Sequence, residues 1–162
     1  NSTGMHMNES GISVPEDIKS RYAKGHIAGK EVNVEFIPEA IQSAGAMYST
    51  TNDLLKYLSA NIGLIQTKIK DAIQETHLIR HSFGESSRDK SLKDYIGLGW
   101  IITTDFGKEV ISHTGSIDGY TSIIGFNPRE QIGLVILCGC DHSDFSAPEM
   151  IDLVIPFLLY FK

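Results

Sequence analysis

Residues that can bind a metal ion gather near the end of the sequence, at Cys138, Cys140, Asp141 and His142. Zinc prefers thiolate and imidazole ligands, but a closed zinc site takes four of them, usually from two separated pairs. No second pair of cysteines or histidines follows at finger-like spacing. We therefore predict that this cluster is a strand of small residues followed by a turn, with no metal and no cofactor.

Cys138 and Cys140 are separated by one residue in a segment that has the composition of a strand. On an extended strand, the Cα atoms of residues two apart lie about 6.5 to 7 Å from one another, beyond the usual separation in a disulfide. We therefore expect both thiols to be free.

His77 and His81 lie one helical turn apart, but no acidic residue completes a motif on that face, and we expect both rings to be solvated.

A serine three residues before a lysine can act as a nucleophile with the lysine as its base, and Ser87 and Lys90 have this spacing. Such a lysine accepts the serine proton only when burial lowers its pKa and leaves a neutral amine. Residues 82–94 are polar and would not bury Lys90, so we do not expect Ser87 to be a nucleophile. Ser59 and Asn61 have the spacing of a Ser-x-Asn motif, but an exposed face at the end of a helix explains them more simply.

The first part of the sequence predicts loops and then a helix. Residues 1–45 are rich in turn-forming residues and show little periodicity, so we expect loops and extended segments there. A helix is predicted at 48–63, with Thr50 and Asp53 as a capping box and Gly63 at its end. Its apolar residues share one face: Leu54, Leu55, Leu58 and Ile62.

Beyond this helix the periodicity of the sequence changes. A second helix is predicted at 64–81, followed by a polar loop at 82–94. Four runs of strand-forming residues with short turns between them then predict an antiparallel meander: 97–104, 108–113, 120–127 and 132–139. A last helix begins at Ser146, with Glu149 completing a capping box, and its broad apolar face must lie against the sheet.

Three segments carry a resemblance to a known family. Residues 44–63 read AGAMYSTTNDLLKYLSANIG, residues 97–100 read GLGW, and residues 113–137 read HTGSIDGYTSIIGFNPREQIGLVIL. In residue types, order and spacing they resemble the serine β-lactamase family of class C type, which includes class C β-lactamases, D-alanyl-D-alanine carboxypeptidases and other penicillin-binding proteins, D-aminopeptidases and related esterases. The most specific part is the His-Thr-Gly motif followed by Gly-Tyr, a proline turn and an apolar strand, and the resemblance covers nearly the whole chain.

The resemblance implies an α+β fold in which an antiparallel sheet is flanked by helices and joined to an all-helical region, with the active site between them. Residues 1–162 would be the C-terminal portion of one such β-lactamase/transpeptidase-like domain, with loops and helices in 1–94 and antiparallel strands and the C-terminal helix in 95–162. The first two motifs of the family are a Ser-x-x-Lys nucleophile on a buried helix and a Tyr-x-Asn loop. Both are expected before residue 1, and no Tyr-x-Asn occurs in the sequence.

The resemblance also implies roles for the residues of the His-Thr-Gly motif. Thr114 would offer its hydroxyl to the carboxylate of the substrate, and His113 would occupy the place of the more frequent lysine. Gly115 would let the ligand approach the backbone, and the N–H of Ser116 would complete an oxyanion hole with that of the missing nucleophile. His113 and Ser116 are thus the catalytic candidates, and Thr114, Gly115 and Tyr48 are the substrate-binding candidates, although Tyr48 fits a place in the core equally well.

Histidine in the place of lysine changes the electrostatics of the motif. Imidazole has a reference pKa of about 6.5, so His113 would be only partly charged at neutral pH and carboxylate binding would depend on pH. A histidine here is familiar from the peptidase and esterase branches of the family.

We interpret Gly119 as a bulge glycine, and Tyr120, Trp100 and Tyr95 as aromatic residues that pack in the core.

Composition narrows the class of partner. The chain has 162 residues, 41% of them apolar and 21% charged, with a formal net charge of -6, which fits one globular domain and disfavours a nucleic-acid surface. Its longest apolar runs are too short or too interrupted to span a membrane. No signal peptide is expected at 1–15, and Asn1 in place of an initiator Met predicts sequence upstream. Analogy to the family suggests an extracytoplasmic or cell-envelope location, although free thiols would allow a reducing interior.

We expect the chain to be the C-terminal part of an acyl-serine hydrolase that acts on D-amino-acid peptides, β-lactams or esters, and to be inactive by itself. Two alternatives remain open. One is a non-catalytic domain that binds a peptide or partner through the same cleft. The other is a product that self-associates through an exposed sheet edge. The expected partners are therefore a small-molecule or peptide substrate, together with the missing N-terminal part or a second copy of the chain.

Overall fold

An antiparallel sheet forms the centre of the molecule. The computed structural model describes Met5 and residues 7–33, 39–141, 143 and 145–161. In these residues each strand of the main sheet pairs with the next one in the sequence, in the order β3-β4-β5-β6-β7-β8. The six strands are β3 (His81–Glu85), β4 (Lys93–Ile96), β5 (Ile101–Asp105), β6 (Lys108–Ile117), β7 (Tyr120–Asn127) and β8 (Ile132–Cys138). This arrangement confirms the predicted antiparallel meander and the α+β class.

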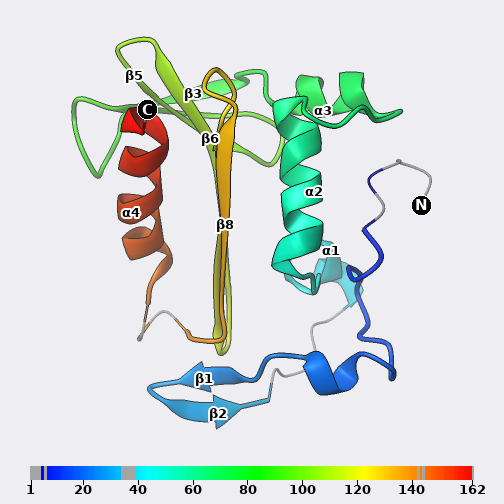
Figure 1. The fold of residues 1–162 in the computed structure, drawn as a ribbon. Coiled ribbons are helices and arrows are strands. Elements are labelled where there is room, and N and C mark those ends of the chain that lie inside the picture. Colours follow the sequence, from blue (N-terminus) through cyan, green and yellow to red (C-terminus); the bar gives the residue numbers. More distant parts are fainter. Residues whose placement is uncertain (1–4, 6, 34–38, 142, 144, 162) are drawn as a thin grey trace.

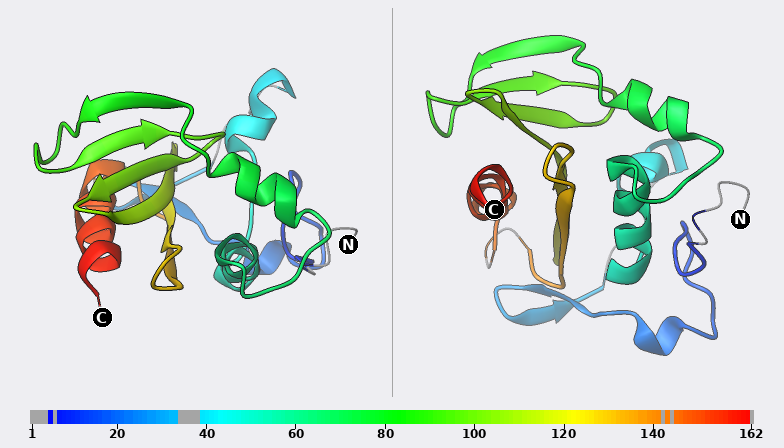
Figure 2. Two further views of the ribbon diagram at one scale, coloured as in Figure 1. Left: turned by 90° about the horizontal axis from the view of Figure 1, so that it is seen from above. Right: turned by 45° about the horizontal axis from the view of Figure 1, so that its top comes forward.

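Helices cover both faces of the sheet. Figures 1 and 2 show α2 and α4 on opposite sides of β8, with the small hairpin of β1 and β2 beyond one end of the long strands. The helices and the small hairpin have these bounds: η1 (Lys19–Arg21), β1 (Gly25–Ile27), β2 (Lys30–Val32), η2 (Glu39–Ile41), α1 (Gln42–Gly45), α2 (Thr51–Ile62), α3 (Lys70–Thr76) and α4 (Ala147–Tyr160). The two long helices therefore pack on opposite faces of the sheet where it is formed by β6, β7 and β8.

Helix α4 forms as the sequence predicts. The Ser146 side chain accepts a hydrogen bond from the backbone N–H of Glu149, and the Glu149 carboxylate accepts one from the backbone N–H of Ser146, so the capping box is complete. Its apolar stripe packs on β6 and β7. The cluster on this face contains Leu92, Val110, Ile123, Met150, Val154, Ile155, Leu158 and Leu159.

Helix α2 begins and ends at the predicted signals. The side chain of Thr50 accepts a hydrogen bond from the backbone N–H of Asp53, and Gly63 ends the helix with a φ of 89°, in the left-handed region that favours glycine. Leu58 is buried in the cluster on this face, together with Trp100, Ile102, Ile111 and Phe126. Leu55 is 44% exposed, so its assignment to the buried face of the helix is wrong.

Two predicted elements of the middle segment are wrong. The second helix is only the seven residues of α3, and the segment 82–94 that we interpreted as a polar loop contains most of β3 and the first two residues of β4. Every residue of β3 is exposed, so it has no alternation between buried and exposed side chains that a sequence pattern can reveal. Backbone pairing with β4 holds this edge strand in place.

His77 is half-buried at the end of α3, in contrast to the solvated ring that we predicted. The Nδ2 of Asn61 donates to the backbone oxygen of Tyr57, so its Oδ1 is left to accept from the Nε2–H of His77 at 2.8 Å. The ring also contacts Trp100 and Phe126, with centroid distances of 5.9 and 5.2 Å. Burial in these surroundings lowers the pKa of His77 below its reference value of 6.5.

This shift predicts a dependence of stability on pH. The unfolded ring binds a proton near pH 6.5, whereas the folded ring does so only at lower pH. The stability that the neutral ring contributes is therefore present above about pH 6.5 and is lost as the pH falls below it. We expect the urea midpoint to drop between pH 7.5 and 5.5. The drop should be smaller in His77→Gln, which keeps a polar group without a titrating ring. Equal drops in the two proteins would contradict this assignment.

Candidate active site

A pocket of about 480 Å³ brings the predicted site residues together. Its wall includes His113, Thr114, Gly115 and Ser116 from β6, and Tyr48 from the segment between α1 and α2. Further lining comes from β7, from the end of β8 and from the N-terminal segment. All five candidates named from the sequence thus surround one cavity, although their sequence positions are up to 68 residues apart (116 minus 48).

The segment of β6 that bears these residues has one open edge. Strand β5 pairs with β6 from Lys108 to Ser112, whereas β7 pairs with it from Ile111 to Ile117. In the described residues, no strand therefore lies beside residues 113–117 on the β5 side. An open strand edge offers unpaired backbone groups with which an extended ligand can form hydrogen bonds.

The register of the two hairpins decides which backbone groups face this edge. A two-residue loop joins Ile117 to Tyr120, and the pair that flanks such a loop exchanges hydrogen bonds. Along an antiparallel strand the bonding direction alternates, so His113 and Gly115 point their N–H and C=O groups toward β7. Thr114 and Ser116 point theirs toward the open edge.

Gly115 is held close to the neighbouring strand. A Cβ atom built on it would lie 2.7 Å from the Oγ of Ser122 on β7. The same hydroxyl donates to the backbone oxygen of Gly115 at 3.4 Å. Contact with β7 is therefore a packing reason for glycine here, in addition to the expected approach of a ligand.

Tyr48 is positioned by a bridge to the N-terminal segment. The backbone N–H of Gly11 donates to the oxygen of Tyr48 at 3.1 Å, and that of Tyr48 donates to the oxygen of Gly11 at 2.9 Å. A Cβ atom on Gly11 would lie 3.0 Å from the Tyr48 hydroxyl, so the phenol ring packs directly on this backbone. Tyr48 is half-buried and lines the pocket.

An ion pair that the sequence did not reveal lies in the wall of the pocket. Arg21 donates to the carboxylate of Glu9, which also accepts from the hydroxyl of Thr50 at 3.4 Å. The hydrogen bond from Arg21 lowers the pKa of Glu9 below its usual range. No periodicity or motif connects these residues, because they lie in loops and a single turn of 3-10 helix.

Tyr120 also belongs to the pocket, although we predicted a core residue. Its hydroxyl donates to the backbone oxygen of Ala23 at 2.6 Å, and burial is the main cause that raises its pKa to about 12. A Cβ atom on Gly25 would lie 2.6 Å from the ring of Tyr120.

Gly119 is a turn glycine between β6 and β7, with a φ of 79°, and the interpretation as a bulge glycine is wrong.

The two other candidate motifs, Ser87 with Lys90 and Ser59 with Asn61, do not line the pocket. Ser87 and Lys90 are exposed, so the burial that would activate a Ser-x-x-Lys pair is missing there. The hydroxyl of Ser59 donates to the backbone oxygen of Leu55 within α2, at 2.7 Å. Trp100 is 5% exposed and packs edge-on against Phe126, which confirms its predicted place in the core.

Cys138 and Cys140 form a disulfide, so the prediction of free thiols is wrong. Strand β8 ends at Cys138, and a bend at Gly139 and Cys140 brings the two Cα atoms to 5.2 Å, within the range that a bridge requires.

Among the residues that the structure describes, no group of three or more potential ligands could hold a metal ion. His142, which we considered with this cluster, lies outside the described residues. The described helices include none that could cross a membrane.

Comparison with known proteins agrees with this architecture. The family model described as Beta-lactamase matches residues 3–157. A structure titled "A class C beta-lactamase" is 21% identical, with a TM-score of 0.78, and the match covers 98% of this chain and 48% of that one. A β-lactamase/D-alanine carboxypeptidase from Pseudomonas syringae is 20% identical, with a TM-score of 0.77, and the match covers 98% of this chain and 50% of that one.

A third similar structure is a class C β-lactamase from Rhodobacter sphaeroides, at 17% identity and a TM-score of 0.67, with 85% of this chain and 46% of that chain covered. The chain thus spans about half the length of the solved structures that it matches. At these identities the structures establish the fold, and the family match over most of the sequence establishes the relationship. The chain belongs to the Beta-lactamase family and forms about half of that fold.

Proposed function

We propose that this chain is the C-terminal part of an acyl-serine hydrolase that acts on D-amino-acid peptides, β-lactams or esters. The observation that carries the proposal is the open edge of β6 at residues 113–117, which forms one wall of a pocket of about 480 Å³. A pocket of this size can accept a small molecule or the end of a peptide. Family membership supports the reaction class.

Each residue of the motif has a proposed role in this pocket. The N–H of Ser116 faces the open edge and stabilises the oxyanion of the tetrahedral intermediate. The Thr114 hydroxyl and the imidazole of His113, which is exposed, bind the carboxylate of the substrate. Gly115 lets the substrate approach the backbone, and Tyr48 contacts it from the opposite segment.

The proposal requires the part of the fold that carries the acylated serine, either joined to this chain or as a separate partner. The literal Ser-x-x-Lys of this chain, Ser87 and Lys90, is exposed and outside the pocket. The matched structures are about twice as long as this chain, which leaves room for a complementary half. Strand β8 ends the sheet and has one paired edge in the described residues, so the complementary half or a second copy can add a strand there.

Intact-mass analysis tests the proposal. The chain is incubated with a β-lactam and with a fluorophosphonate ester, alone and after addition of a complementary half that carries the Ser-x-x-Lys helix. We expect no adduct on the isolated chain, a stoichiometric adduct on the added half, and hydrolysis only in the mixture.

A stoichiometric adduct on the isolated chain would show that it contains its own nucleophile, and Ser87→Ala would then be the first variant to examine. Saturable ligand binding without any adduct in the mixture, measured on a sample that circular dichroism shows to be folded, would favour a non-catalytic binding domain. Light scattering of the isolated chain distinguishes a monomer from self-association through β8.

A further inference from the structure

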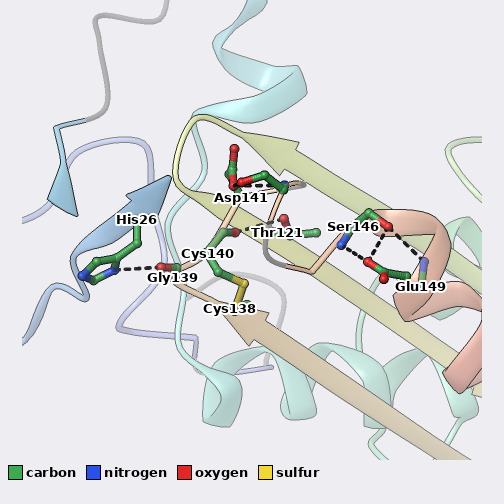
Figure 3. Close-up of a disulfide and its surroundings, with 9 residues drawn as sticks. His26, Thr121, Cys138, Gly139, Cys140, Asp141, Ser146 and Glu149 are labelled. Atoms are coloured by element: carbon green, nitrogen blue, oxygen red, sulfur yellow. Dashed lines mark hydrogen bonds between the residues drawn. A yellow bond between two sulfur atoms is a disulfide. The ribbon is translucent and has the colours of Figure 1, made fainter. Parts of the chain in front are cut away.

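The Cys-Gly-Cys turn at the end of β8 is joined closely to the small hairpin of β1 and β2. Figure 3 shows the bridged cysteines with His26 on one side and Thr121 on the other. The Nδ1–H of His26 donates to the backbone oxygen of Gly139 at 2.9 Å, and the backbone N–H of Asp141 donates to the oxygen of His26 at 3.0 Å. One residue of β1 therefore holds the turn on both sides of Cys140.

Further contacts fix the same turn. The hydroxyl of Thr121 donates to the backbone oxygen of Cys140 at 3.0 Å. A Cβ atom on Gly139 would lie 2.6 Å from the backbone oxygen of Lys24, so only glycine fits where the two backbones approach. Cys138 and Gly139 also line the pocket described above. The position of this turn therefore determines both the shape of the pocket wall and the place where β1 contacts the end of β8.

A bridge between residues two apart contributes little as a structural crosslink. The stabilisation from closing a loop grows with its length, and this loop encloses only Gly139. Both cysteines are only partly buried, so a small thiol reagent can reach them. The bridge does restrain the backbone, since the 5.2 Å between its Cα atoms is shorter than the roughly 6.5 to 7 Å of an extended strand.

We propose that Cys138 and Cys140 form a redox-responsive clip, which a dithiol reductant opens and which, when opened, loosens β1 from the end of β8. A thiolate of the reductant attacks one cysteine sulfur, the S–S bond breaks, and the other cysteine leaves as a thiolate that takes up a proton. The second thiol of the reductant, after losing its proton, displaces the first cysteine and closes the disulfide of the reductant. The protein gains two electrons and two protons, and the dithiol loses the same.

Opening removes the covalent restraint, so the turn can relax toward the extended strand. The carbonyl of Gly139 and the N–H of Asp141 then move away from His26, and the two hydrogen bonds to β1 weaken. The hydrogen bonds at the C-terminal end of α2 are not among those that hold the turn. The Leu64 N–H, which donates to the oxygen of Ser59 at 2.8 Å, is a suitable internal reference.

Hydrogen exchange of the full chain tests the clip. With dithiothreitol as the reductant, we expect the Asp141 amide to exchange at least about tenfold faster than in the oxidised protein, with Leu64 unchanged. Iodoacetamide should label two cysteines after reduction without denaturant and none before it. Reoxidation should restore the slow exchange.

The matched control is the Cys138→Ser/Cys140→Ser variant, in which exchange of Asp141 should be fast and insensitive to dithiothreitol. Equal exchange of Asp141 in the oxidised and reduced wild-type chain would overturn the proposal, as would cysteines that are reduced only after unfolding. Because both comparisons use the wild-type chain, the proposal stays testable even if the double variant does not fold.

Discussion

Replacing Ser116 with proline is expected to slow acylation by about a hundred- to a thousandfold, the usual loss when one oxyanion-hole donor is removed. Proline has no N–H, and the register of β6 points this N–H of Ser116 toward the open edge. The ladder to β7 loses no hydrogen bond, because residues 115 and 117 make those bonds. The substitution therefore removes the proposed donor while the sheet remains paired.

Ser116→Ala is the matched control, since it keeps the N–H and removes only the hydroxyl. It should retain most of the acylation rate. The measurement is the rate of acyl-enzyme formation with a chromogenic β-lactam, in this chain complemented by the half that carries the serine. Near-UV circular dichroism verifies that both variants are folded. Similar rates for the proline and alanine variants would remove Ser116 from the proposed oxyanion hole.

The second large effect concerns the core rather than the site. Leu158→Ala is expected to lower the free energy of unfolding by about 2 to 5 kcal/mol, through lost burial and the cavity left behind. Leu158 is 0% exposed in α4 and belongs to the cluster between this helix and the sheet. Urea denaturation, followed by the fluorescence of Trp100, measures the change.

Leu153→Ala provides the control on the same helix. Leu153 is 60% exposed, so the same truncation should change the free energy of unfolding by less than about 0.5 kcal/mol. If the two variants lost the same free energy, α4 would not pack on the sheet as described. If Leu153→Ala were the more destabilising, a partner would have to cover its exposed side in solution.

The two faces of the sheet and its two edges have different roles in these experiments. Helices α2 and α4 bury the faces and supply stability, whereas the open edge of β6 supplies the proposed binding groups. A core substitution is therefore expected to change unfolding without altering the donors at Ser116. The edge substitution, Ser116→Pro, is expected to slow acylation without altering the free energy of unfolding.

Local signals in the sequence determined the long elements. The capping box of Ser146 and Glu149, the N-cap Thr50 and the terminal Gly63 each act within one helical turn, so they locate α4 and α2 without reference to the rest of the fold. Short turns determined the hairpins of the meander in the same way. The His-Thr-Gly motif, from His113 to Gly115, located the wall of the pocket because its residues are consecutive.

Contacts between distant segments decided what the sequence could not. Strand β3 is exposed throughout and forms only because β4 lies beside it. His77 is buried because Asn61, Trp100 and Phe126 surround it, and Glu9 meets Arg21 across loops.

The disulfide depends on the tertiary structure for the same reason. Cys138 and Cys140 would be too far apart on a continuous strand, and the bend between them is held by His26 and Thr121, more than 100 and about 20 residues away along the chain. Neighbouring residues set the local preferences of the backbone. An exposed edge strand, a buried imidazole and a bent turn instead arise from packing between segments that no local pattern connects.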